Sequence, residues 1–359
     1  MAVITGLATL TAYGRGTGPL WDGVLGGIPA LSPVTRFDLT GRRARYAATL
    51  PGHPDLTGEL ATLIDGACTQ AGLTADERAA TPLLLARHLT GPVDPATAAL
   101  AGTCGLRRLE RIHTNACAAA GSAVADAAAS LLLDEYPRVV VAAGQLVDAD
   151  GFASFDSAGV LAPDGISRPF SAGRQGPVLG DGAGALVIET PAEARRRGAE
   201  PLVRLAGWGQ AGDAHHVARP HPEGRGTARA VAAALRRAGV GAQDVGYVNA
   251  HATSTPAFDS AEAAGLRRAF GPYTGRVPVS STKPLHGHCL TAAGMVELAV
   301  CALALRHGLL PVNAGYLGPD PSCRLDLVLD RPRPVAARYA LSLSAGFGGT
   351  CTALLLEVV

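Results

Sequence analysis

The chain has 359 residues, of which 48% are hydrophobic and 17% charged, and its 31 basic and 30 acidic residues leave a formal net charge of +1. This composition predicts a globular protein with a large core and gives no global electrostatic reason to expect nucleic acid or a membrane as partner. The N-terminal residues lack the basic start and apolar stretch of a secretory signal, so we expect a cytoplasmic protein. The seven cysteines are odd in number and form no CxxC pair, which predicts neither a disulfide framework nor a zinc site.

Short apolar runs alternate with Gly-rich turns and Ala-rich helical stretches along the chain. The predicted strands are residues 2–4, 138–142, 185–188, 245–248, 277–280, 341–343 and 353–356. The predicted helices, with apolar residues near a three-to-four spacing, are residues 121–133, 226–238, 260–270 and 294–307. This alternation predicts an α/β fold with buried sheets. In residues 51–111, Pro, Gly and Thr break up Ala- and Leu-rich pieces, and the pattern predicts no particular element there.

Cys117 stands in Thr-Asn-Ala-Cys-Ala-Ala-Ala-Gly, just before a stretch whose alanines favour a helix. A thiol at a helix N-terminus lies at the positive end of the helix dipole, which favours the thiolate and makes the sulfur a better nucleophile. A small cysteine buried in the core is the alternative, because cysteine is among the most buried residue types. Cys117 by itself leaves both interpretations open.

Three further motifs stand at predicted strand ends. His251 lies in Tyr-Val-Asn-Ala-His-Ala-Thr-Ser-Thr-Pro-Ala-Phe-Asp, and His288 lies in Ser-Ser-Thr-Lys-Pro-Leu-His-Gly-His-Cys-Leu-Thr-Ala-Ala-Gly. The third motif, Ser-Ala-Gly-Phe-Gly-Gly-Thr at residues 344–350, has glycines that let backbone N–H groups approach a ligand. Because α/β enzymes place their chemistry at strand ends, these motifs and Cys117 predict one site.

Together, the four segments resemble those of the elongating β-ketoacyl synthases that act on acyl carrier proteins. Residues 168–174, Arg-Pro-Phe-Ser-Ala-Gly-Arg, and residues 178–189 are similar to the mid-chain signature of that family, and residues 3–7 resemble its opening strand. One such motif alone would be weak, whereas four in this order are specific. The resemblance is close over residues 112–359 and looser over residues 1–50.

The resemblance implies a thiolase fold, layered α-β-α-β-α, with two mixed sheets and a buried central helix layer. It implies an N-terminal half, residues 1–195, that carries the nucleophile, and a C-terminal half, residues 196–359, that carries both histidines. It implies no cofactor. The implied partners are acyl carrier protein with phosphopantetheine-bound substrates and a second subunit, either another copy of the chain or a related chain.

The implied reaction is a decarboxylative Claisen condensation in fatty acid or polyketide biosynthesis. Cys117 takes the acyl chain as a thioester, while His251 and His288 stabilise the enolate that forms when a malonyl thioester loses carbon dioxide. The backbone N–H groups of Cys117 and Phe347 match the family's oxyanion hole, and Phe347 also matches its gating position.

Other matched positions support these groups. Lys283 and Glu297 match a charged pair behind the second histidine. Thr253 and Thr255 match threonines that line the malonyl and pantetheine side, where their hydroxyls hydrogen-bond the amide-rich arm. Four further matches are two supporting carboxylates after the first histidine and two glycines that bind substrate: Asp259, Glu262, Gly348 and Gly349.

Two alternatives to the condensing enzyme stay open. The first is a ketosynthase-like acyltransferase that passes the acyl group to an amine or alcohol, and the second is a silent partner subunit, against which the intact cysteine and histidines argue. The chain departs from the family in residues 51–111, a segment that is markedly shorter than its counterpart in the family. It also has Ala252 and Cys351 where the family commonly has Gly and Asn, and neither change removes a reacting group.

Three other patterns have simpler interpretations. The histidines at 286–288 and 215–216 lack the spacing of a standard metal site, so we predict no metal. The glycines of residues 180–184 lack the register and the following lysine of a phosphate loop and predict a tight turn. The arginines at 195–197 form either a solvated helix end or a docking patch for an acidic carrier protein.

Overall fold

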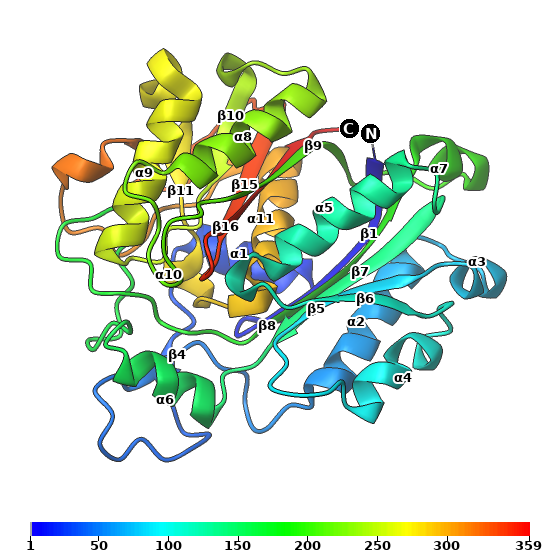
Figure 1. The fold of residues 1–359 in the computed structure, drawn as a ribbon, viewed down its shortest axis with the longest axis horizontal. Coiled ribbons are helices and arrows are strands. Elements are labelled where there is room, and N and C mark those ends of the chain that lie inside the picture. The colour runs from blue at the N-terminus through cyan, green and yellow to red at the C-terminus, as the bar shows by residue number, and fades with distance from the viewer. Residues whose placement is uncertain (1) are drawn as a thin grey trace.

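The computed structural model describes residues 2–359, whose strands build one large mixed sheet (Figure 1). The N-terminal strands are β1 (Ala2–Thr11), β2 (Gly14–Arg15), β5 (Leu83–Arg87), β6 (Leu109–His113), β7 (Arg138–Gln145) and β8 (Gly182–Glu189). The C-terminal strands are β9 (Val203–Gly212), β10 (Val245–Asn249), β11 (Pro278–Ser280), β13 (Asp326–Leu327), β15 (Tyr339–Ala345) and β16 (Thr350–Glu357). Two short pairs stand apart: β3 (Ser32–Pro33) with β4 (Tyr46–Ala47), and β12 (Leu309–Leu310) with β14 (Arg333–Pro334).

The strand order is β13-β11-β10-β15-β16-β9-β1-β8-β7-β5-β6, with β2 beside β1. Going outward from the β1–β9 contact, each half has two antiparallel pairings followed by parallel ones. The two expected sheets are therefore halves of one continuous sheet, because Ala2, Val3 and Ile4 of β1 pair with β9. We propose that residues 1–195 and 196–359 are the two halves that this repeated order relates.

Helices cover both outer faces and fill the space between the halves. They are α1 (Thr17–Gly26), α2 (Leu56–Gln70), α3 (Ala75–Ala79), α4 (Pro95–Thr103), α5 (Ala119–Leu132), α6 (Ala149–Ser157), α7 (Pro191–Arg197), α8 (Arg225–Ala238), α9 (Pro256–Phe270), α10 (Lys283–His286) and α11 (Ala293–His307). α2 covers β1, β7 and β8, while α8 covers β9 and β16 and contacts α9. α5 and α11 contact each other at the centre (Figure 1). The largest hydrophobic cluster surrounds these two helices, with one smaller cluster under each outer layer.

The four predicted helices correspond to α5, α8, α9 and α11, and each predicted strand lies within an observed one, except that residues 277–280 begin one residue before β11. Strand β9 was not predicted, because Gly207 and Gly209 break its apolar pattern. The structure shows why they are glycine: a Cβ there would lie 2.1 Å from Ala234 O and 1.9 Å from Ala230 O of α8. Residues 51–111 are fully folded and contain α2, α3, β5, α4 and β6.

The segment Leu290–His307 is apolar and long enough by composition to cross a membrane. However, 78% of it is buried inside the fold, where it forms α11 and the short turn before it. The helix ends at Gly308, which adopts a left-handed conformation with a φ of 64°. A core helix explains its composition.

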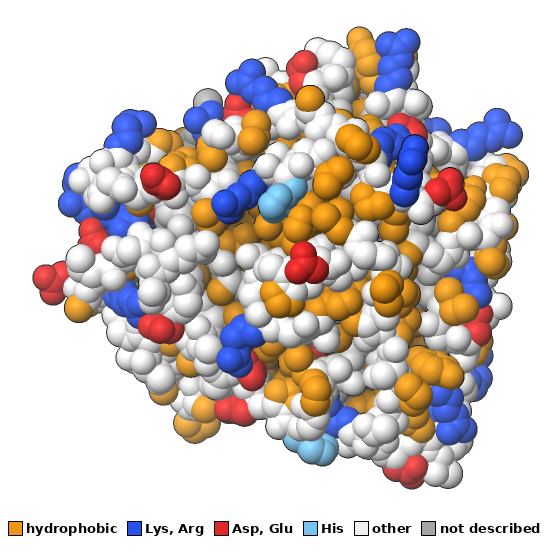
Figure 2. Space-filling model, turned by 180° about the vertical axis from the view of Figure 1, so that it is seen from behind, with side chains coloured by type: hydrophobic (Ala, Val, Ile, Leu, Met, Phe, Trp, Pro, Cys, Tyr) orange, Lys and Arg blue, Asp and Glu red, His pale blue; other side chains and the backbone are white. Residues whose placement is uncertain are grey.

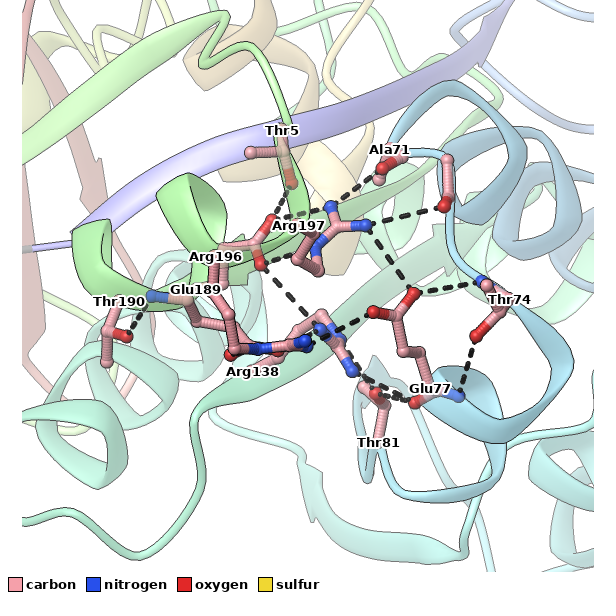
Figure 3. A network of polar contacts seen from close by, with 12 residues as sticks. Thr5, Ala71, Thr74, Glu77, Thr81, Arg138, Glu189, Thr190, Arg196 and Arg197 are labelled. Atoms are coloured by element: carbon pink, nitrogen blue, oxygen red, sulfur yellow. Dashed lines mark hydrogen bonds and ion pairs between the residues drawn. The ribbon is translucent and has the colours of Figure 1, made fainter.

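Two of the three consecutive arginines join α7 to the body of the protein (Figure 3). Arg197, whose side chain is 4% exposed, donates to both carboxylate oxygens of Glu189 at 3.0 Å. Arg196 donates to Glu193 and, at 3.2 Å, to Glu77 of α3. Arg197 is thus buried in an ion pair within the chain, whereas the Arg196 side chain is 61% exposed, and the docking patch stays a prediction.

Charges of both signs share the surface. Figure 2 shows the side opposite to the view of Figure 1, where basic and acidic side chains are interspersed among hydrophobic ones. Neither sign dominates this face. The distribution agrees with the near-equal numbers of basic and acidic residues in the sequence.

Candidate active site

Cys117 and His288 stand at the starts of the two central helices. Cys117 lies in a short 3-10 turn that leads into α5, and His288 lies two residues before a similar turn that leads into α11. The two helices approach closely at their first turns, where a Cβ on Gly294 would lie 3.0 Å from Gly121 N. Because glycine permits this approach, the two helix starts bring the thiol and the imidazole to one point.

The structure brings together the three residues predicted to react. His288 Nε2 lies 3.1 Å from Cys117 Sγ, and the ring of His251 is nearly perpendicular to that of His288, with centroids 5.5 Å apart. Cys117 is 8% exposed and the two histidines 3% and 2%. His251 follows β10, and Glu262 of α9 holds its turn by accepting hydrogen bonds from the N–H groups of His251 at 2.8 Å and Ala252 at 2.7 Å.

A non-glycine residue with positive φ stands in each of the three motifs. Ala116 has a φ of 51° just before Cys117, Ser254 has 64° shortly after His251, and Leu290 has 45° shortly after His288. Such residues are uncommon and each costs on the order of 1–3 kcal/mol. The surrounding fold therefore holds these three turns in shapes that they would not adopt alone.

Burial decides the protonation states at the site. It raises the pKa of the Cys117 thiol to about 12, although the charge of Lys283 partly opposes the rise. It lowers the pKa of His251 and of His288 well below the ordinary value, and Lys283 lowers both further. The thiol is thus protonated and both imidazoles are neutral at pH 7. The expected effect of the helix dipole, a favoured thiolate, is outweighed by burial.

Lys283 is the only lysine of the chain. It is 1% exposed and its ammonium group pairs with the carboxylate of Glu297, which is fully buried. Burial raises the pKa of Glu297 to about 7, and the charge of Lys283 opposes that rise. All other Lys and Arg positions hold arginine, and the lysine ammonium is more compact than a planar guanidinium. That compositional signal marks Lys283 without any family resemblance.

A cavity of about 320 Å³ opens onto the thiol and both imidazoles. Thr253, Thr255 and Phe347 line it, as the sequence predicts for residues near the substrate. Its walls also contain residues to which the sequence analysis assigned no function, among them Phe155, Val160, Pro177, Arg219 and Phe258. The signal for Phe258 was present, because it follows Thr255 by three residues in the same motif.

The loop between β15 and β16 lies against the nucleophile. A Cβ on Gly346 would lie 3.3 Å from Cys117 N, so the two backbones are in contact. The neighbouring N–H of Gly348 donates to Val217 O at 2.6 Å, whereas the N–H of Phe347 has no acceptor within residues 2–359. Gly348 and Gly349 adopt φ values of 86° and 79° and are not on the cavity wall, and their contact with substrate stays a prediction.

Asp259 connects α9 to the mid-chain segment 168–174. Its Oδ2 accepts a hydrogen bond from Phe170 N at 2.8 Å and lies 3.8 Å from Arg174 Nε. Burial raises the pKa of Asp259 to about 7. Asp259 and Glu262 thus both act on backbone: the first holds Phe170 and the second holds His251.

The other histidines serve structure or lie near the surface. Within residues 2–359, no group of three or more His, Cys, Asp and Glu side chains is arranged to hold a metal ion. His286 is fully buried and outside the cavity wall, with Nε2 3.0 Å from Thr282 Oγ1 and Nδ1 2.8 Å from Gly287 O. The rings of His215 and His221 lie 4.9 Å apart in the loop after β9.

The fold and the buried cysteine and histidines are those of a thiolase-fold condensing enzyme, and comparison with known proteins agrees. Sequence models of the N-terminal and C-terminal domains of β-ketoacyl synthases match residues 94–194 and 202–316. Nodulation protein E of Rhizobium leguminosarum bv. trifolii is 33% identical over 400 residues, which cover 99% of each protein. The 3-oxoacyl-(acyl-carrier-protein) synthase 2 of Synechocystis sp. is 30% identical over 398 residues, covering 97% of this chain and 95% of that protein.

Solved structures give the same result. The ishigamide ketosynthase/chain length factor superposes with a TM-score of 0.89 at 27% identity, and a β-ketoacyl synthase from Burkholderia phymatum with 0.90 at 25%. Each comparison covers 100% of this chain and 99% of the other. The chain therefore belongs to the β-ketoacyl synthase family, which confirms the predicted family and fold. It is a condensing acyltransferase of fatty acid or polyketide synthesis.

Proposed function

We propose that the protein joins an acyl group on Cys117 to a malonyl-type unit by decarboxylative Claisen condensation, with both substrates delivered by acyl carrier protein. The observation that carries the proposal is the cluster of a thiol and two imidazoles at one cavity. Sγ and Nε2 of His288 are 3.1 Å apart, and the ring of His251 is 5.5 Å from that of His288. This arrangement suits two consecutive steps that share one carbonyl site.

Loading is the first step. The sulfur of Cys117 attacks the carbonyl carbon of the incoming thioester, a new S–C bond forms, and the donor S–C bond breaks. The thiol proton passes to Nε2 of His288 and then to the departing thiolate. A thiol with a raised pKa needs a base within hydrogen-bond reach, and the neutral imidazole of His288 is within that reach. Because its lowered pKa makes His288 a weak base, the proton leaves the sulfur as the new S–C bond forms.

The tetrahedral intermediate of loading carries its negative charge on the former carbonyl oxygen. Two backbone N–H groups, of Cys117 and Phe347, are suited to stabilise it. Contact between Gly346 and Cys117 N brings the two loops together, and the Phe347 N–H has no acceptor within the described chain. Preformed donors of this kind are worth more in a dry cavity than in water.

Condensation is the second step. The bond between the malonyl α-carbon and its carboxylate breaks, carbon dioxide leaves, and the electron pair forms an enolate. Two neutral imidazoles each have one N–H to donate to the enolate oxygen, and for His288 this requires the tautomer with the hydrogen on Nε2, the nitrogen that faces Cys117. The enolate carbon then attacks the acyl carbonyl on Cys117, a carbon–carbon bond forms, and the S–C bond to Cys117 breaks. The condensation consumes one proton, which the sulfur takes up from water to return to its resting thiol state.

Thr253 and Thr255 support the delivery of both substrates through the same opening. Their hydroxyl oxygens lie 3.3 Å apart on the cavity wall, next to His251 in the sequence. Hydroxyl groups there suit the amide groups of a phosphopantetheine arm. A ketosynthase of type II polyketide synthesis in complex with its acyl-carrier protein has the same fold, with a TM-score of 0.91 at 22% identity.

We further propose a second subunit, either a copy of this chain or a related one. Strand β6 ends the sheet order, so its outer edge has no strand partner within residues 2–359. An unpaired edge is the common place for strand-to-strand association. Sedimentation should show a dimer at micromolar concentration, and a monomer alone would contradict this proposal.

Intact-protein mass spectrometry tests the function. The chain is incubated with acyl-loaded carrier protein, then with malonyl-loaded carrier protein, while released carbon dioxide is measured. We expect the acyl mass on Cys117, then its loss together with carbon dioxide release and a β-ketoacyl product on the carrier. Transfer of the acyl group to an amine or alcohol without decarboxylation would instead establish the acyltransferase alternative. Absence of loading would indicate the silent subunit.

A further inference from the structure

Three of the seven phenylalanines of the chain meet at the cavity. Phe155 comes from α6, Phe258 from the first turn of α9, and Phe347 from the loop between β15 and β16. The other four phenylalanines lie in the hydrophobic clusters or pack against them. Three distant parts of a sequence with only 4% aromatic residues thus supply rings to one small space.

The three rings form one connected group, which we call the aromatic wall. The centroid of Phe347 lies 6.2 Å from that of Phe155, with the planes stacked at 28°, and 6.0 Å from that of Phe258 in an edge-on arrangement. Phe258 in turn stands edge-on to His251, at 6.5 Å. Phe347 is 43% exposed, and the other two are half-buried. The aromatic wall therefore presents ring surface beside His251.

The remaining apolar wall is made of small or rigid residues. It consists of alanines, prolines and a single valine, and no Leu, Ile or Met lines the cavity. The core also contains many alanines, but it combines them with numerous leucines, which the cavity wall lacks. Flexible aliphatic side chains adapt to a flexible acyl chain, whereas aromatic rings are flat and stiff.

We propose that Phe155 and Phe258 make the site selective for acyl groups with a planar, conjugated segment next to the thioester, over saturated chains of equal length. The proposal rests on the proposed function, because the acyl group is the one carried by Cys117. A planar π-system stacks on ring faces, which adds to the free energy of simple burial. A conjugated chain also has fewer rotatable bonds to immobilise.

The selectivity acts on loading and requires no redox step. The S–C bond of the donor thioester breaks and the S–C bond to Cys117 forms, while the carbon–carbon double bonds of the acyl group stay unchanged. Ring stacking of about 0.5–1.5 kcal/mol corresponds to roughly a two- to tenfold preference. We expect each of the two phenylalanines to contribute a preference of this size.

A competition experiment tests the proposal. The protein is mixed with equal amounts of the hexanoyl and 2,4-hexadienoyl thioesters of N-acetylcysteamine, which have the same carbon count, and intact mass spectrometry measures the two acyl forms of Cys117. Conjugation itself changes the reactivity of a thioester, so the quantity compared is the hexadienoyl-to-hexanoyl ratio in each variant relative to the parent.

The variants separate ring chemistry from general damage. Phe155→Leu and Phe258→Leu should each lower the ratio about two- to tenfold, because leucine fills similar space without a ring. Phe258→Tyr keeps the ring and should preserve the ratio. Phe37→Leu is the matched control, because Phe37 packs on Phe152, 5.5 Å away, outside the cavity, and its ratio should equal that of the parent.

An equal ratio in the parent and both leucine variants would overturn the proposal, as would an equal fall in Phe37→Leu. Loss of the preference in Phe258→Tyr would also contradict it. Failure of the parent to release carbon dioxide from malonyl thioester would contradict the proposed condensation. The ratio of the two acyl forms of Cys117 would still test the proposed selectivity. Absence of acyl-Cys117 with either thioester would contradict both proposals.

Discussion

In the proposed reaction, the nucleophile Cys117 depends on its neighbour His288. Its pKa of about 12 keeps the sulfur protonated at rest, so a base must remove the proton as the new bond forms. His288, with Nε2 3.1 Å from the sulfur, is within reach, and His251 has no hydrogen bond to the thiol. This asymmetry between the histidines has a kinetic consequence.

Replacement of each histidine by alanine should separate the two steps. His251→Ala should lower condensation by about a hundredfold to a thousandfold, the usual loss for one donor to a developing oxyanion, while loading persists. His288→Ala should lower both, because it removes the base as well as a donor. Acyl-Cys117 formation and carbon dioxide release are measured separately. Full carbon dioxide release by both variants would sink the Claisen mechanism.

Lys283 provides a second test at the scale of single residues. Lys283→Met leaves the buried carboxylate of Glu297 unpaired, and breaking one side of a buried ion pair costs about 3–5 kcal/mol in unfolding free energy. The double variant Lys283→Met, Glu297→Leu removes both charges and should recover most of that loss. Urea titration of both variants measures the difference.

Activity should not recover with stability in the double variant. The charge of Lys283 is one cause of the lowered pKa of His251 and His288. Without it, both pKa values rise toward the ordinary value, and the acid limb of the pH–rate profile for condensation should move to higher pH. An unchanged profile would show that burial alone sets these protonation states.

Among the elements, the contact between α5 and α11 positions the chemistry. Each helix begins with one reacting residue, and their separation is fixed where Gly294 faces Gly121. Gly294→Ala places a methyl group 3.0 Å from Gly121 N and 2.9 Å from Ser344 Oγ, so the helices must move apart. The same change should therefore affect both stability and catalysis.

We expect Gly294→Ala to lower the unfolding free energy by about 1–3 kcal/mol, as overpacking does. Loading should fall by on the order of tenfold to a hundredfold, because small displacements of reacting groups are costly. Gly102→Ala in α4 is the control: nothing lies within 4 Å of the added methyl, and alanine favours the helix. Equal behaviour of the two variants would contradict the importance of the contact.

At the scale of the whole molecule, buried titratable groups couple stability to pH. Burial lowers the pKa of His251, His286 and His288, that of His286 to about 3. Below about pH 6.5 the unfolded chain binds protons that the folded chain excludes, so these histidines destabilise the fold as pH falls. Asp259 and Glu297, whose pKa values are raised to about 7, have the opposite effect because the folded state binds their protons first.

A comparison between the parent and His286→Gln separates the effect of this histidine on stability from the effects of the buried carboxylates. Glutamine can keep hydrogen bonds to Thr282 and Gly287 but does not titrate. Relative to the variant, the parent should lose about 2–3 kcal/mol of unfolding free energy between pH 7.5 and 4.5, the window between the unfolded and folded pKa values. Urea titrations across this range measure it. A difference that does not change with pH would mean that His286 titrates normally in the fold.

The fold class and the candidate reacting residues can be predicted from the amino-acid sequence alone. Apolar runs and Ala-rich segments gave seven strands and four helices, because burial imposes periodicity that is visible locally. Cys117, His251 and His288 were found because each stands in a motif at an element boundary, where the signal again is local. Strand β9, helices α1 and α6 and the elements of residues 51–111 were not predicted. In β9 the apolar pattern is broken because Gly207 and Gly209 pack closely against α8, a contact that the local pattern does not reveal.

The protonation state, ion pairs and cavity contacts of these residues depend on the tertiary structure. The helix start of Cys117 predicted a favoured thiolate, and burial from all sides reversed that effect. The arginines after Glu193 are paired with Glu189 and with Glu77, more than a hundred residues away, which no local pattern reveals. Phe155 and Phe258 reach one cavity from separate helices. Desolvation, ion pairing and cavity shape depend on which distant segments meet, and that is fixed by the packing of the whole chain.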